Sequence, residues 1–122
     1  MGAAYFIVLE RKIDGLETFI NGKDLARQME SLDEAARRLG VRPLLEFYSI
    51  APEQAAEFAE MDISEVNLPP LEQFSAQDGL STVHALMTCS EGQAAIEDLK
   101  DCERILTVAA QHGVGWHFEI DV

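Results

Sequence analysis

The sequence predicts an α+β fold in which a small sheet of about three strands packs against helices. Three short runs rich in β-branched and aromatic residues, at 4–10, 44–50 and 114–122, are typical of strands. Between these runs, apolar residues recur at intervals of four and three, which is the period of an amphipathic helix. A length of 122 residues suits one domain and allows a core to form without disulfides or a metal. We therefore expect residues 1–122 to form a single domain in the order β-α-β-α-α-α-β.

The first half of the chain predicts two strands joined by a helix. Residues 4–10 form a continuous apolar run, which is typical of a strand covered on both faces. Residues 23–39 carry one apolar helical stripe. Gly40 is placed to end this helix in a left-handed conformation, with Val41 folding back on its last turn. Residues 44–50 read as the second strand, which a helical crossover would make parallel to the first.

The second half predicts mainly helix. Residues 52–60 begin with a proline and suit a short helix, whereas the prolines within 61–76 indicate an irregular segment. A further helix is expected over 78–89. Ser90, followed three residues later by glutamine, resembles a capping box that would open one long helix over 90–111.

The last strand, 114–122, alternates between apolar and polar residues, so we expect one face to be buried and the other to face water or a shallow groove. His117 and Glu119 share the polar face. If the strand at 44–50 lies beside them, Glu46 and Tyr48 complete a pocket. A histidine–carboxylate pair beside a tyrosine suits general-base catalysis or cation binding, and a solvated polar face is the alternative interpretation.

The charge is unevenly distributed along the chain. The net charge is −13, yet residues 1–42 contain seven basic and seven acidic side chains and sum to zero. Residues 43–99 contain eleven acids and no lysine or arginine. Such a segment favours basic partners and disfavours nucleic acid and anionic membranes, because like charges repel.

From this charge pattern we expect a non-enzymatic module that docks a basic protein through segment 43–99. An acidic surface that only keeps the protein in solution is the alternative interpretation. The residues placed to make the docking contact are Glu53, Glu57, Glu60, Asp62 and Glu65.

Several classes of chemistry lack their motifs. The sequence contains no glycine-rich phosphate loop, no dinucleotide fingerprint and no nucleophile elbow. Cys89 and Cys102 have no second cysteine or histidine at zinc-binding spacing, so we expect inert thiols, no metal site and no cofactor.

The opening residues lack the pattern of a signal peptide, and no apolar run has the length of a membrane span. We therefore expect a cytoplasmic protein. It would be a monomer, or a homodimer in which exposed sheet edges pair with each other.

Four stretches, read together, resemble a group of small bacterial proteins of unassigned function. These are Tyr5–Lys12, Asp78–Met87, Asp101–Leu106 and Gly113–His117. The resemblance implies a bacterial, cytosolic, stand-alone domain, and it implies no catalytic residues.

Overall fold

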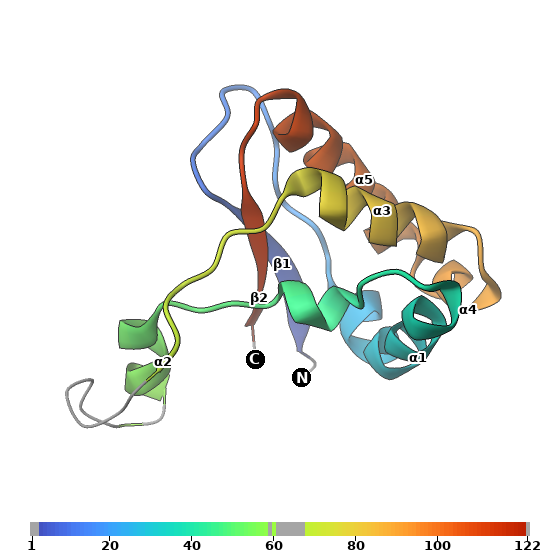
Figure 1. Ribbon diagram of the computed structural model, residues 1–122, viewed down its shortest axis with the longest axis horizontal. Helices are drawn as coiled ribbons and strands as arrows, with labels where there is room; N and C mark the ends of the chain where they lie inside the picture. The colour runs from blue at the N-terminus through green and yellow to red at the C-terminus, as the bar shows by residue number, and fades with distance from the viewer. Residues whose placement is uncertain (1–2, 59, 61–67, 122) are drawn as a thin grey trace.

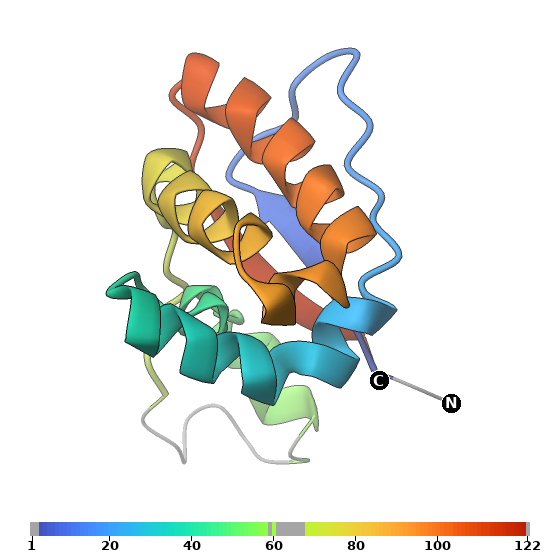
Figure 2. The same cartoon turned by 90° about the vertical axis from the view of Figure 1, so that its right-hand side faces the viewer.

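The computed structural model describes residues 3–58, 60 and 68–121 (Figure 1). The sheet has two strands, and helices lie over one of its faces (Figure 2). The α+β class is therefore confirmed, whereas the predicted third strand is wrong. In chain order the elements are β1 (Ala4–Leu9), α1 (Lys23–Leu39), the 3₁₀ helix η1 (Leu44–Phe47), α2 (Pro52–Phe58), α3 (Ala76–Met87), α4 (Ser90–Gln93), α5 (Ile96–Gln111) and β2 (Trp116–Asp121).

The sheet joins the two ends of the chain. β1 and β2 run antiparallel, with Ile7 opposite Phe118. A two-stranded sheet is marginal by itself and needs a packed face. Here Tyr5, Ile7, Trp116 and Phe118 provide that face and belong to the same core cluster as the buried residues of α1, α3 and α5.

Residues 44–50 form a 3₁₀ turn and one parallel bridge, Tyr48 to Phe118, in place of the predicted strand. Burial explains the difference. Leu44 and Phe47 are buried, whereas Leu45 between them is exposed. A spacing of three puts both buried residues on one side of a 3₁₀ turn, but a strand would place them on opposite faces.

Trp116 is the centre of the core beside the sheet. Its ring is fully buried, stacks on Phe47 at a centroid distance of 4.9 Å and meets Phe118 edge-on at 4.8 Å. Its indole N–H donates to the Ser75 carbonyl oxygen at 3.1 Å. A Cβ at Gly79 would overlap this ring, so glycine there allows α3 to approach β2 closely.

The predicted end of the first helix is confirmed. Gly40 has φ 76°, and the Val41 N–H donates to the Ala36 carbonyl oxygen at 3.0 Å. The helix predicted over 78–89 begins earlier, at Ala76, because the Ser75 hydroxyl accepts hydrogen bonds from the first turn of α3.

The single long helix predicted over 90–111 is wrong. The chain breaks it at Ala95, whose φ of −126° and ψ of 25° are not helical. Gly92 explains the separate short turn, because a Cβ there would overlap the Leu86 carbonyl oxygen. The predicted capping box is also wrong: Cys89 occupies the N-cap, and the Ser90 hydroxyl contacts the side chain of Glu91.

Asp98 connects α5 to the start of α1. Its side chain is 3% exposed, and Oδ2 accepts hydrogen bonds from the backbone N–H groups of Asp24 at 3.1 Å and Leu25 at 3.2 Å. The N-cap of α1 is Gly22, which has no side chain to do this. Asp98 thus satisfies two N–H groups that would otherwise be unpaired at the helix start.

We expect Asp98→Ala to lower the free energy of unfolding by about 1–3 kcal/mol, because it leaves two partly buried N–H groups without an acceptor. Urea denaturation measures this loss. The neighbouring exposed Glu97 provides the control, and Glu97→Ala should change stability by less than about 0.5 kcal/mol. Equal effects of the two substitutions would contradict the capping role.

Candidate functional site

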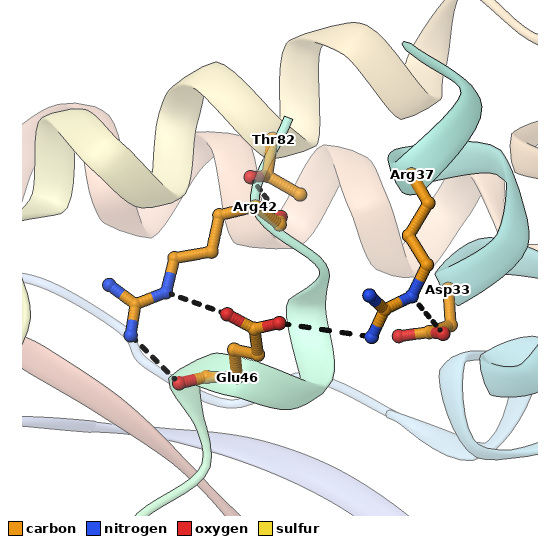
Figure 3. Close-up of polar contacts among 5 residues, drawn as sticks. All are labelled: Asp33, Arg37, Arg42, Glu46 and Thr82. Atoms are coloured by element: carbon orange, nitrogen blue, oxygen red, sulfur yellow. Dashed lines mark hydrogen bonds and ion pairs between the residues drawn. The ribbon is translucent and has the colours of Figure 1, made fainter. Parts of the chain in front are cut away.

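Glu46, one of the acids in segment 43–99, lies between two arginines (Figure 3). Its carboxylate is 3.8 Å from Arg37 Nη2 and 3.6 Å from Arg42 Nε. Arg37 also donates from Nε to Asp33 at 2.9 Å, as the four-residue spacing within α1 allows. Cations from residues 1–42 therefore balance this carboxylate.

Arg42 is positioned by aromatic rings as well as by Glu46. Its guanidinium carbon lies 4.9 Å from the centroid of Phe47 and 4.7 Å from that of Phe74. Its backbone carbonyl oxygen accepts a hydrogen bond from the Thr82 hydroxyl (Figure 3). These contacts connect the residue that precedes η1 to α3, and they hold the Arg42 guanidinium next to Glu46.

Glu91 is also balanced by an arginine from the first third of the chain. Arg38 donates to its two carboxylate oxygens at 2.8 and 3.1 Å. Hydrogen bonding from Arg38 is the main reason why the pKa of Glu91 is lowered to about 2. Glu97 pairs with Lys100 at 3.5 Å. With Asp98 bound to backbone N–H groups, each of these three carboxylates has a partner within the fold.

Within segment 43–99, the described acids without a cation lie around α2, except for Asp78 on α3. Glu53, Glu57, Glu60 and Glu72 are exposed, and within the described residues none is within ion-pair distance of a lysine or arginine. Asp62 and Glu65, which the sequence also predicts for this surface, lie outside the described residues. We call residues 48–58, 60 and 68–72 the acidic arm.

The acidic arm is attached to β2 and extends away from the helical layer. Figure 1 shows α2 apart from the other helices. The Ser49 N–H donates to the Phe118 carbonyl oxygen at 3.1 Å, and the Ser49 hydroxyl accepts from the Glu72 N–H at 2.9 Å. The second contact brings the outgoing and returning segments of the arm side by side.

Apolar side chains are exposed at the base of the same arm. Tyr48 is 37% and Leu71 is 40% exposed. The bond between Ser49 and Glu72 makes their segments neighbours. Leu71 is exposed, whereas Phe74, three residues later, is buried. In the sequence near Leu71, the one sign of this exposure is the pair of prolines before it, which indicates an irregular segment.

The polar pocket predicted around His117 is only partly assembled. His117 Nε2 lies 2.7 Å from Glu119, and Nδ1 lies 3.1 Å from the Gln73 side-chain oxygen. Tyr48 reaches the edge of β2 beside them, but Glu46 is held by arginines.

The sequence predicts that His117 lies on a face open to water or a shallow groove. This is wrong, because His117 is only 1% exposed. The segment containing Gln73 runs along β2 through the bridge from Phe74 to Trp116. Both ring nitrogens of His117 already have partners, so this arrangement offers no nitrogen to a ligand. Sequence reasoning missed Gln73, because an irregular segment gives no periodicity from which to place it.

Comparisons with protein-family models, with curated proteins and with solved structures found no match. Among the described residues, no three histidine, cysteine, aspartate or glutamate side chains converge as a metal site would require. No helix in the described part of the chain is long and apolar enough to cross a membrane. Cys102, which lies on the apolar stripe of α5, is buried, and desolvation raises the pKa of its thiol.

We expect Arg38→Ala to return the pKa of Glu91 from about 2 toward the ordinary glutamate value, because the substitution removes both hydrogen bonds. A carbon-13 NMR titration of the carboxylate measures this pKa. Since the folded-state pKa is lowered, the pair stabilises the fold above the ordinary glutamate pKa. This contribution is lost as the pH falls toward about 2. An unchanged titration in the variant would contradict the pairing.

Proposed function

We propose that this chain is a non-enzymatic protein-binding module whose acidic arm docks a basic partner. The observation that carries the proposal is the contrast between the arm and the other acids of segment 43–99. Glu46, Glu91 and Glu97 have cationic partners, whereas Glu53, Glu57, Glu60 and Glu72 are exposed in the arm without one in the described structure. Among the described residues, Asp78 on α3 is the other exposed acid of the segment without a cation, and it stands apart from the arm. The proposed surface is accordingly smaller than the whole segment.

The composition of the arm supports the same interpretation. Protein interfaces combine apolar anchors with a polar rim, and tyrosine is enriched among the anchors. Tyr48 and Leu71 are suitable anchors at the base of the arm, and the carboxylates of α2 would form the rim. Rim charges mainly accelerate the encounter with an oppositely charged protein and confer salt dependence.

The test uses the chain as bait in a lysate of its own cells at about 50 mM and about 300 mM salt. The variant Glu53→Gln/Glu57→Gln/Glu60→Gln removes rim charge from the arm. The matched control, Asp14→Asn/Glu30→Gln/Glu34→Gln, removes the same charge from exposed positions elsewhere. Both variants change the net charge from −13 to −10, which is −13 + 3.

We expect a basic protein that the wild type and the control retain at low salt and that the arm variant loses. Raising the salt should release this protein from the wild type and from the control, because screening weakens attraction between exposed charges. If the arm variant and the control retain the same proteins at both salt concentrations, docking through the arm is wrong.

Leu71→Ser tests the apolar part of the surface with the partner identified in this way. Because the side chain is 40% exposed, its loss should leave the fold intact. We expect the dissociation constant to rise about five- to tenfold, as for an anchor of moderate strength. Isothermal titration calorimetry measures the change, and the exposed Leu39 on α1 provides the control substitution.

A further inference from the structure

The outer edge of β1 has backbone groups that face away from β2. In the antiparallel ladder, residues bond alternately to the partner strand and to the outside. Glu10 donates its N–H to Gly115, which places Phe6 and Val8 among the residues that bond to β2. Tyr5, Ile7 and Leu9 therefore direct their N–H and carbonyl groups outward.

This outer edge is only partly occupied. The Tyr5 N–H donates to the Gly22 carbonyl oxygen at 3.1 Å. Within the described residues, no backbone group bonds to the N–H or carbonyl of Ile7 or to the N–H of Leu9 on this side. The outer edge of β2 differs, because Trp116 exchanges two hydrogen bonds with Phe74.

A groove of about 410 Å³ lies along the open part of β1, between this strand and the loop that leads to α1. Ile13 and Leu16 contribute apolar surface, and Arg11 and Lys12 contribute charge. None of the described lining residues is acidic. The adjoining groove, of about 560 Å³, contains Phe19, which is 73% exposed.

The positive charge at this groove is not neutralised by a carboxylate among the described residues. Arg11 donates to the neutral carbonyl oxygen of His112 at 3.1 Å, and the exposed Lys12 makes no ion pair with any residue that the structure describes. Glu10 lies between Leu9 and Arg11 in the sequence, but its carboxylate accepts a hydrogen bond from the Gly115 N–H, on the side of β1 that faces β2. The acidic arm is attached to the opposite edge of the sheet, at Ser49.

We propose that the outer edge of β1 binds an extended acidic segment of another polypeptide as a third strand. The segment would bond to the outward backbone groups of Ile7 and Leu9, as in strand addition to an open sheet edge. Its acidic side chains would lie against Arg11 and Lys12, and alternate apolar side chains would enter the groove. A second copy of this chain fits less well, because its β1 contains no acidic residue.

The test measures amide hydrogen exchange by NMR with an added hexapeptide of alternating valine and glutamate. We expect the amides of Ile7 and Leu9 to become at least about tenfold more protected, which corresponds to about 1.4 kcal/mol. The amides of Phe6 and Val8 face β2 and serve as internal controls. A hexapeptide with lysine in place of glutamate should give no added protection.

Charge variants separate the edge from its cations. Lys12→Glu should weaken binding of the acidic hexapeptide about tenfold, and Arg11→Glu should weaken it further. The control variant Lys100→Glu, on α5, should leave binding unchanged. If Arg11→Glu fails to fold, Lys12→Glu alone still tests the role of the cations. Three results would overturn the proposal: protected Ile7 and Leu9 amides without peptide, protection that rises with protein concentration alone, or equal binding of both hexapeptides.

Discussion

The structure depends on the pairing of its first and last strands. A two-stranded sheet has two edges and is stable only if one face is covered. On the covered face, the Trp116 ring of β2 packs against Phe47 and beside Gly79 of α3. Because the sheet of the described residues has two strands, each strand keeps an outer edge, and each candidate surface lies at one of these edges.

The two edges have opposite chemistry. The edge of β2 is extended by the bridges at Tyr48 and Phe74 and carries the acidic arm. Among the described residues, no backbone group bonds to the outer edge of β1 at Ile7, and no carboxylate pairs with the cations beside it. The net charge of −13 therefore does not show where on the molecule the negative charge lies. Some carboxylates are neutralised by ion pairs, such as the one between Arg38 and Glu91.

Local signals in the sequence predicted what is local in the structure. The stripe of α1, its end at Gly40 and the burial of Cys102 follow from spacing and backbone conformation. Contacts between distant segments were not predictable in this way. Nothing near Asp98 indicates that it caps another helix, and alternation alone cannot show that an irregular segment bonds to the ring of His117.

The same limit applies to the candidate site. The absence of lysine and arginine from residues 43–99 identified an acidic segment, and the residues predicted in α2 are exposed. The sequence could not show which acids are balanced, because their arginine partners lie up to 53 positions away. For Glu46, the partner Arg42 lies four residues earlier and is a local signal, whereas the second partner, Arg37, is presented by another helix and could not be predicted.

The claim that negative potential is concentrated on the acidic arm can be measured directly by proton relaxation with a cationic and a neutral paramagnetic cosolute. The ratio of the two relaxation enhancements reports the local potential at each amide. We expect the ratio to be highest at residues 53–57 and much lower at residues 37–46, where arginines balance the carboxylates. A ratio that is uniform over the surface, or highest near Glu91, would contradict the account.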